Sequence, residues 1–302
     1  MLNFHSSELL ATPPASIEYL VDGILPLGTG GDVSGPPGEG KSTILLSLCG
    51  AISSGRSWFG MRTKHMPVAW ITGEASGRDA IARDLHRLRI DANADISFFT
   101  VDQEMFRFDG EAWTTTAEGD AVIEQLRAAR IGFVIIDTIG SVCAGLKEID
   151  NDQQRQLARH LRGALAGMTW LTISHTNQAS AKDALPWRLH YLSRAGGNGF
   201  PGAVRWAAGV AAVTENDYTL PKVKLPDEDR RRRLVGFGVS KHNEMPRAAW
   251  TNQHPTIFEI KPDGALVLVI DGREGKNFTP AEQPQFGRKK EEANERPAVC
   301  TL

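Results

Sequence analysis

The stretch Gly35-Pro36-Pro37-Gly38-Glu39-Gly40-Lys41-Ser42 fits the pattern G-x-x-x-x-G-K-[ST] at every fixed position. Residues 31–34, before it, have the composition of a short buried strand, and residues 43–49, after it, begin an apolar helix. A strand, a glycine-containing turn and a helix N-terminus are the setting that this motif needs. The sequence therefore predicts a P-loop, a phosphate-binding turn, at residues 35–42.

The chemistry of such a loop follows from its backbone. Gly35 and Gly40 are expected to adopt angles that a β-carbon would resist, so that the backbone N–H groups can wrap a phosphate. Lys41 is expected to reach the β- and γ-phosphates, and the Ser42 hydroxyl to bind Mg²⁺. The other residues predicted to bind the nucleotide are Pro36, Pro37, Gly38, Glu39 and Thr43. ATP and Mg²⁺ are therefore the predicted cofactors.

A second diagnostic stretch is Phe133-Val134-Ile135-Ile136-Asp137-Thr138, an apolar run that ends in an aspartate. After a P-loop, this is the Walker B pattern, in which Asp137 orients a water molecule on the Mg²⁺ held by Ser42. The alternative is a buried strand followed by an ordinary N-cap aspartate.

Bulk properties restrict the class of protein. The chain has 302 residues and a formal net charge of −2, so its overall charge predicts no particular partner. Its three cysteines are scattered, which suggests a reducing compartment and no zinc site. No apolar run approaches the roughly 18 residues that a membrane span needs. The N-terminus lacks a signal-peptide pattern, so we expect a cytoplasmic protein without membrane contact.

Strand-like and helix-like segments alternate through the first part of the chain, which predicts a mostly parallel, twisted α/β sheet flanked by helices. Strands are expected at 31–34, 67–72, 96–101, 133–138 and 170–175, and helices at 43–49, 79–90, 116–130 and 153–165. Residues 176–203 read as a long, polar, glycine-rich loop. The strands expected after residue 204 have no helices between them and suggest added antiparallel edge strands.

The domain organisation is expected to be simple. Residues 1–30 form a lead-in that packs on the core or on a neighbouring subunit. Residues 31–271 form one ATPase core, since no second hydrophobic core is evident. Residues 272–302 are polar and few of them are apolar, so we expect a disordered tail.

Several stretches taken together resemble the RecA-like hexameric replicative helicases, which are P-loop NTPases, and most closely the plasmid RepA-type helicases. They occur in that family's order over about residues 17–250. The matching stretches are 34–42, Trp70-Ile71-Thr72-Gly73-Glu74, Val134-Ile135-Ile136-Asp137-Thr138, Ile173-Ser174-His175, Ser193-Arg194-Ala195-Gly196, Val204-Arg205-Trp206 and Phe237-Gly238-Val239-Ser240-Lys241-His242-Asn243.

The resemblance implies roles for four residues outside the P-loop. Glu74 would be the general base that activates the attacking water, and His175 would sense the γ-phosphate. Arg205 would be an arginine finger donated into the site of the adjacent subunit, with Lys241 close to it on the next strand. Considered alone, Glu74 could be a helix cap, His175 a structural histidine, Arg205 a surface residue and Lys241 an edge-strand solubiliser.

The resemblance also implies two loops that track single-stranded DNA, at residues 141–151 and 176–197. The second is the more basic, and its predicted DNA-binding residues are Lys182, Arg188 and Arg194. The alternative is a solvated surface loop.

The interpretation is a ring-forming DNA helicase, a homo-hexamer that moves along single-stranded DNA in replication, with a primase or initiator protein as a further partner. One alternative is a RecA/RadA-like DNA-dependent ATPase of recombination or repair that does not unwind DNA. A second alternative is a P-loop kinase for a small molecule, which would work as a monomer.

Overall fold

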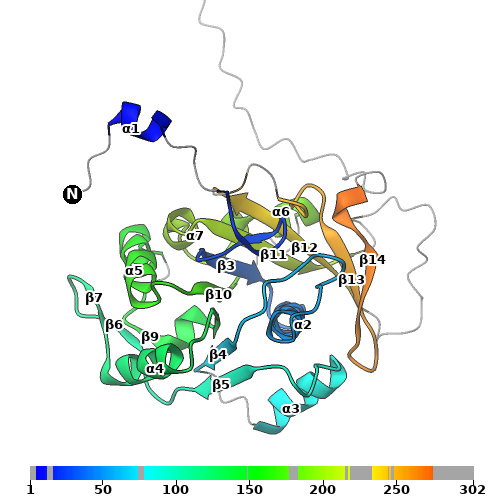
Figure 1. Ribbon diagram of the computed structural model, residues 1–302, viewed down its shortest axis with the longest axis horizontal. Coiled ribbons are helices and arrows are strands. Elements are labelled where there is room, and N and C mark those ends of the chain that lie inside the picture. Colours follow the sequence, from blue (N-terminus) through cyan, green and yellow to red (C-terminus); the bar gives the residue numbers. More distant parts are fainter. Residues whose placement is uncertain are drawn as a thin grey trace, which may run out of the picture.

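The computed structural model describes residues 5–11, 16–73, 78–147, 149–176, 183–214, 217, 233–243, 245 and 248–274. Within these ranges a nine-stranded sheet forms the centre of the molecule, in the order β14-β13-β12-β11-β3-β10-β8-β4-β5 (Figure 1). Its strands are β3 (Gly30–Gly35), β4 (Val68–Thr72), β5 (Ile96–Thr100), β8 (Phe133–Asp137), β10 (Thr169–His175), β11 (Trp206–Ala212), β12 (Arg233–His242), β13 (Thr256–Ile260) and β14 (Leu266–Ile270). The mixed α/β sheet confirms the predicted fold class.

The sheet has a parallel part and an antiparallel part. Strands β5, β4, β8, β10, β3 and β11 run parallel, whereas β12, β13 and β14 each run antiparallel to their neighbours. The expectation that all strands after residue 204 are antiparallel is therefore wrong for β11. A parallel neighbour needs a crossover connection, and the long segment between β10 and β11 provides one.

The sequence suggested that this connecting segment is an open loop, but the structure shows that it is not. It contains the short helices α6 (Leu185–Arg188), η3 (Tyr191–Ser193) and α7 (Gly199–Ala203). Leu185, Leu189 and Phe200 are fully buried, so this segment has apolar anchors in the fold. These buried residues could not be recognised in the sequence, because they are surrounded by glycine and polar residues.

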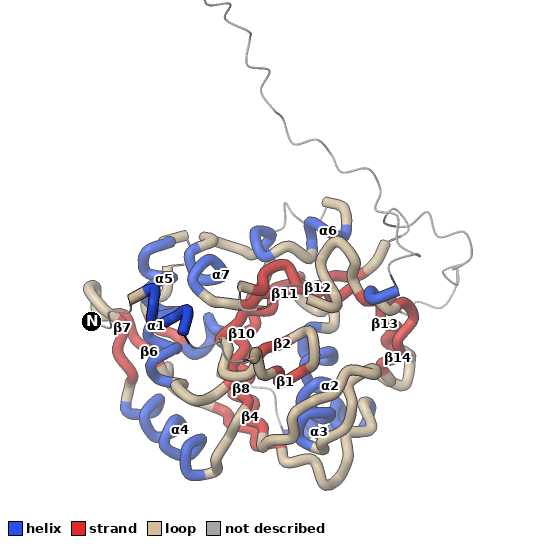
Figure 2. Tube along the Cα trace, turned by 45° about the horizontal axis from the view of Figure 1, so that its top comes forward, coloured by secondary structure: helices blue, strands red, loops and turns tan. Residues whose placement is uncertain are grey.

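Helices cover both faces of the sheet. Helices α2 (Lys41–Ser53) and α3 (Arg78–Arg87) lie on one face, and α4 (Ala117–Ala128) and α5 (Asn151–Ala164) lie on the other (Figures 1 and 2). Side chains alternate along a strand. Accordingly, Phe133 and Ile135 belong to the core under α2, while Val134 and Ile136 belong to the core under α4 and α5. This two-sided burial explains the continuous apolar run before Asp137.

A three-stranded sheet, β7-β6-β9, lies beside α4 and was not predicted. It is formed by β6 (Phe106–Phe108), β7 (Trp113–Thr115) and β9 (Cys143–Ala144), and η1 (Ile139–Val142) leads into β9. Strands of two or three residues carry too little periodicity to be recognised in a sequence.

The lead-in segment packs on the core of its own chain through β1 (Tyr19–Val21) and β2 (Leu25–Pro26). The Trp206 indole donates a hydrogen bond to the carbonyl of Ile24 at 2.7 Å. Helix α1 (Ser6–Ala11) stands apart from the body in Figure 1.

The predicted tail begins with a short 3-10 helix, η5 (Gly272–Glu274), and its remainder lies outside the described residues. Among the described helices, none combines the length and the apolar character needed to cross a bilayer.

Candidate nucleotide-binding site

The P-loop joins the end of β3 to the start of α2, as predicted. Gly38 and Gly40 have φ angles of 70° and 91°, in the left-handed region that favours glycine. Gly35 is needed for a different reason than expected. A β-carbon there would lie 2.1 Å from the carbonyl oxygen of Val210 on β11, so only glycine allows this close approach.

Lys41 is the first residue of α2, and its side chain turns back into the loop. Its Nζ donates hydrogen bonds to the carbonyls of Gly35 and Pro36, both at 2.8 Å. The residue is only 6% exposed, so its positive charge is held inside the cradle. An ammonium group at a helix N-terminus is well placed to bind phosphate oxygens.

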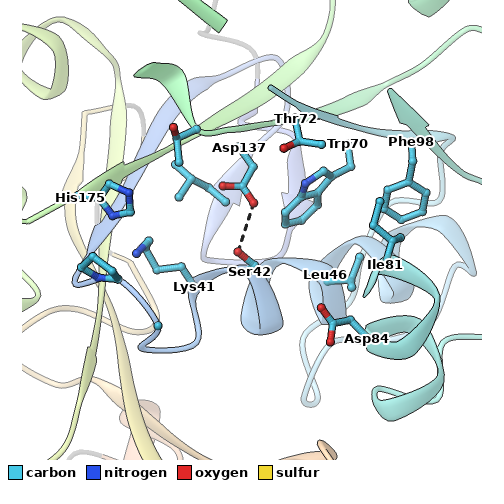
Figure 3. A pocket seen from close by; sticks show the side chains of 14 residues that line it. Lys41, Ser42, Leu46, Trp70, Thr72, Ile81, Asp84, Phe98, Asp137 and His175 are labelled. Carbon is cyan, nitrogen blue, oxygen red and sulfur yellow. Dashed lines mark hydrogen bonds between the residues drawn. The ribbon is translucent and has the colours of Figure 1, made fainter. Parts of the chain in front are cut away.

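Ser42 and Asp137 meet across the site. The Ser42 hydroxyl donates to Oδ2 of Asp137 at 3.2 Å (Figure 3). Mg²⁺ is commonly held by one or two protein oxygens together with phosphate oxygens and water. The hydroxyl and the carboxylate therefore fit an Mg²⁺ site, with Ser42 as the ligand and Asp137 as the partner of a bound water.

These groups open into one pocket of about 430 Å³. Figure 3 shows Lys41 and His175 at one end and Trp70 and Phe98 at the other, with the Ser42–Asp137 pair between them. The complete lining is Pro37, Gly38, Lys41, Ser42, Leu46, Trp70, Thr72, Ile81, Asp84, Phe98, Asp137, Thr138, Ile173 and His175. The polar end can take a triphosphate, and the other end is mostly apolar.

The sheet register explains why distant residues meet in this pocket. His175 ends β10 opposite Gly35, and Thr72 ends β4 opposite Asp137. The carboxyl ends of parallel strands share one edge, where such sheets bind ligands. Glu74 comes two residues after Thr72 and lies outside the described residues.

The remaining residues of the P-loop differ in whether their side chains line the pocket. Pro37 and Gly38 line the pocket, whereas Pro36 contributes its carbonyl to Lys41. The Glu39 carboxylate turns away and accepts a hydrogen bond from the backbone N–H of Ala212 on β11. Thr43, one residue further along α2, is absent from the pocket lining.

Arg205 lies at the opposite, amino end of the sheet. Its backbone N–H donates to the carbonyl of Gly30, the first residue of β3, whereas the P-loop follows Gly35. Those five residues of strand span roughly 17 Å at about 3.3 Å per residue. Arg205 is exposed, and it is remote from the P-loop of its own chain.

Lys241 is close to Arg205, as predicted. It pairs with Ala207 across β11 and β12, and its Nζ donates to the carbonyls of Pro201 and Gly202 at 2.9 and 2.6 Å. Partial burial lowers the pKa of Lys241, and the charge of Arg205 lowers this pKa further. The lysine therefore lies outside the nucleotide pocket of its own chain.

Arg188 and Arg194 are not where a DNA-binding residue is expected. Arg188 is 5% exposed and forms a buried ion pair with Asp217, and it also donates to the carbonyls of Asp183 and Ala212. Arg194 is 6% exposed. The prediction that these two side chains contact DNA is corrected, because both are enclosed by the fold. Lys182, the third predicted residue, lies outside the described residues.

Arg194 instead contacts residues that the sequence analysis did not single out. Its Nε lies 3.5 Å from Oδ2 of Asp32, its Nη1 donates to Gln154 at 3.2 Å, and its guanidinium lies 5.2 Å from the centroid of the Phe200 ring. The available signal was a charged residue, Asp32, inside a strand expected to be buried.

Comparisons with known proteins agree with this geometry. A family model described as an AAA domain (AAA_25) matches residues 2–181, more than half of the chain. No curated protein matches the sequence.

Among solved structures, the KaiC-like protein PH0186 from the hyperthermophilic archaeon Pyrococcus horikoshii OT3 is similar. The match has a TM-score of 0.51 and 14% sequence identity, and it covers 84% of this chain and 100% of that one. At this identity the likeness concerns the fold. The chain therefore belongs to the AAA-domain family and is a P-loop ATPase with a RecA-like fold.

Proposed function

We propose that this ATPase is the subunit of a ring-forming DNA helicase that moves along single-stranded DNA and hydrolyses Mg-ATP at the interfaces between subunits. One observation carries the proposal. Arg205 and Lys241 lie together at the amino end of the sheet, while the nucleotide pocket lies at its carboxyl end.

The separation of the two ends favours a shared site. A strand is too stiff to bring Arg205 to the pocket of its own chain, whereas a neighbour in a head-to-tail ring can offer its amino end to that pocket. In such a ring Arg205 would neutralise charge on the transferring phosphoryl group. Lys241, held on the backbone carbonyls of residues 201 and 202, would lie beside it.

Within the pocket, the proposed roles follow the predicted pattern. Lys41 binds the β- and γ-phosphates, Ser42 and Asp137 hold Mg²⁺, and His175 senses the γ-phosphate. Glu74 is proposed as the base that activates water. Bound Mg²⁺ would supply charge stabilisation for the leaving phosphate.

Contact with DNA is proposed for one lysine of each loop, now that Arg188 and Arg194 are excluded. Lys147 is exposed on the first loop, and Lys182 belongs to the second. Cationic side chains on such loops can follow a phosphodiester backbone. A primase or initiator protein remains a proposed partner.

The test is ATP hydrolysis, with and without single-stranded DNA, by wild type, Lys41→Ala, Arg205→Ala and an assembly in which the two variants are co-expressed in equal amounts. A shared site predicts that each variant alone is inactive. The mixed assembly regains about one quarter of the wild-type sites, because each site needs one intact Lys41 and one intact Arg205 from its neighbour. Arg62→Ala, which changes an exposed arginine paired with Asp22, is the matched control.

Each outcome decides between functions. A mixed assembly that stays inactive, or an Arg205→Ala variant with normal hydrolysis, overturns the shared site. DNA stimulation without strand separation on a forked duplex favours the recombinase-like alternative. A monomer that DNA does not stimulate favours a small-molecule kinase.

A further inference from the structure

We propose that Arg194 and Gln154 are positioning residues that transmit the state of the nucleotide pocket to both proposed DNA loops. The inference rests on the proposed function for the meaning of the loops, but the contacts that carry it are independent of DNA. It assigns a role to polar groups inside the fold that neither binding nor hydrolysis of the nucleotide uses.

The path begins at the pocket. The side chain of His175 lines the pocket, and its backbone carbonyl accepts a hydrogen bond from the N–H of Ala195 at 2.7 Å. The next residue, Thr176, forms an isolated bridge with Arg194. The two ends of the second loop are therefore joined directly behind the histidine that faces the nucleotide.

Arg194 is held between two elements by buried groups. On one side is Asp32 of β3, which is 1% exposed and accepts hydrogen bonds from Thr172 and Ser174 of β10 at 2.7 and 2.8 Å. On the other side is Gln154 of α5, also 1% exposed, whose Oε1 accepts from both Arg194 and the backbone N–H of Phe200.

The contact between Arg194 and Asp32 is incomplete. Their closest atoms, Nε and Oδ2, are 3.5 Å apart, and within the part of the chain that the structure describes this buried Nε has no hydrogen-bond partner. A buried donor without an acceptor is costly, so a small movement of Arg194 toward Asp32 would be favourable. Because Gln154 is bonded to the same guanidinium, that movement would pull on α5 and on Phe200.

Gln153, the neighbour of Gln154, extends the path to the first loop. It is also buried, its Nε2 donates to the carbonyl of Gly145 at 2.9 Å, and its Oε1 accepts from the backbone N–H of Lys147. Two adjacent glutamines at the start of α5 therefore hold one loop each. A displacement of this helix end moves both loops together.

Close packing supports a rigid connection at the same place. A β-carbon on Gly199, at the start of α7, would lie 2.2 Å from the carbonyl oxygen of Asn151, at the start of α5. Tightly packed elements move as units rather than deform. The relay, defined as Asp32, Arg194, Gln154 and Gln153, is therefore a chain of direct contacts, and the proposal requires Arg194 to move between its present position and one closer to Asp32.

The experiment is amide hydrogen exchange of the full chain with and without Mg²⁺ and a non-hydrolysable ATP analogue, in the absence of DNA. In wild type, we expect the analogue to change the protection of two amides by at least about threefold: that of Lys147 in the first loop, and that of Phe200, which follows the second loop and shares Gln154 with Arg194. In Gln154→Leu, the response at Lys147 is lost although its own hydrogen bond to Gln153 is untouched.

Two further variants test the direction of the relay. Gln153→Leu should abolish the response at Lys147 and leave that at Phe200. Gln156→Leu changes a half-buried glutamine of the same helix for which the described part of the chain shows no side-chain hydrogen bond, and it should respond like wild type.

If Gln154→Leu does not fold, Arg194→Lys serves instead. A lysine keeps the charge beside Asp32 but cannot reach Gln154 at the same time, so the response at Lys147 should again disappear. A response that persists at Lys147 in a folded Gln154 or Arg194 variant overturns the proposal, and so does a wild type whose loops do not respond to the analogue.

The proposed function and this relay can fail separately. If DNA stimulates hydrolysis but the protection of the loop amides does not change with the nucleotide, the relay is wrong and the helicase proposal stands. If the loop amides respond to the nucleotide through Gln154 but the protein does not bind DNA, the relay stands and the helicase proposal is wrong.

Discussion

The carboxyl and amino ends of the large sheet carry different chemistry. At the carboxyl end, Lys41, Ser42, Asp137 and His175 come from three neighbouring parts of the fold and converge on one pocket. At the amino end, Arg205 and Lys241 sit on adjacent strands, and the lysine is held by backbone carbonyls. The first end has the groups of a phosphate-binding site within one chain, while the cations of the second end are proposed to reach the pocket of a neighbouring chain.

The strands that separate these ends keep them apart. Because an extended strand does not shorten appreciably, a group at one end cannot serve a phosphate bound at the other end of the same chain. The comparison therefore predicts that changes at the two ends have separable effects on nucleotide binding and on hydrolysis.

The largest effect is expected for Arg205→Ala. Hydrolysis by the assembled protein should fall by about 10³- to 10⁵-fold, the range typical of an arginine finger. The dissociation constant for Mg-ATP should stay within about threefold, since Lys41 and Ser42 are intact. Steady-state hydrolysis and binding of a fluorescent nucleotide measure the two quantities. Arg107→Ala, at an exposed ion pair with Glu104, is the control.

Equal losses of binding and of hydrolysis in Arg205→Ala would contradict the division between the two ends. That result would place the arginine among the groups that bind the ground state.

Lys41→Ala should abolish hydrolysis too, but unlike Arg205→Ala it should also weaken nucleotide binding. Hydrogen bonds to charged groups contribute about 1.5–3 kcal/mol, so nucleotide affinity should fall by roughly 10- to 100-fold. Titration calorimetry with Mg-ATP measures this loss. Lys64→Ala removes an exposed lysine paired with Glu18 and should leave the affinity unchanged. Undiminished affinity in Lys41→Ala would exclude this pocket as the nucleotide site.

Gly35→Ala tests the contact between the P-loop and β11. Because the new β-carbon would overlap the carbonyl oxygen of Val210, we expect a loss of about 1–3 kcal/mol, the typical cost of overpacking. The melting temperature should fall by roughly 3–8 °C. Gly163→Ala is the matched control, because its β-carbon meets nothing within 4 Å inside α5. Equal melting temperatures for the two variants would show that the loop is not pressed against β11.

The smallest effect concerns the pKa of Lys241. This pKa lies below its usual value, first because of burial and then because of the neighbouring Arg205. Arg205→Ala should therefore raise the pKa of Lys241, measured by an NMR titration of isotope-labelled lysine. An unchanged pKa would mean that the two cations are further apart in solution.

The sign of the linked stability change is fixed by the same shift. The pKa of Lys241 is lower in the folded protein than in the unfolded chain. The charged lysine therefore lowers the free energy of unfolding, and this loss is fully present at a pH where the lysine is charged in both states. As the pH rises above the folded-state pKa, the folded protein loses this proton first and the cost is relieved. In Arg205→Ala this gain in stability at alkaline pH should be smaller.

Much of the fold could be predicted because its signals are local. The strand ending at Asp137 is an uninterrupted apolar run, and the P-loop consists of consecutive residues. Helices α4 and α5 begin within two residues of the expected positions. The direction of β11 could not be predicted, because it depends on the hidden helices between residues 185 and 203.

The candidate site divides in the same way. Lys41, Ser42 and Asp137 could be placed in one pocket because each belongs to a local motif, and His175 joins them at the end of its strand. Gln153 and Gln154 could not be recognised, since a glutamine on an amphipathic helix is ordinarily at the surface.

The sequence by itself determined the phosphate cradle and the strands around it, because motif and periodicity depend only on neighbours along the chain. Only the tertiary structure decided that Arg188 and Arg194 are internal and that Arg205 is exposed far from its own pocket. The physical reason is that an arginine keeps its charge wherever it lies, so that a buried arginine needs a partner, whereas an exposed one can remain hydrated until it meets an anion. The residue type does not say whether that partner is a buried aspartate of the same chain, such as Asp217 or Asp32, or a phosphate on another molecule.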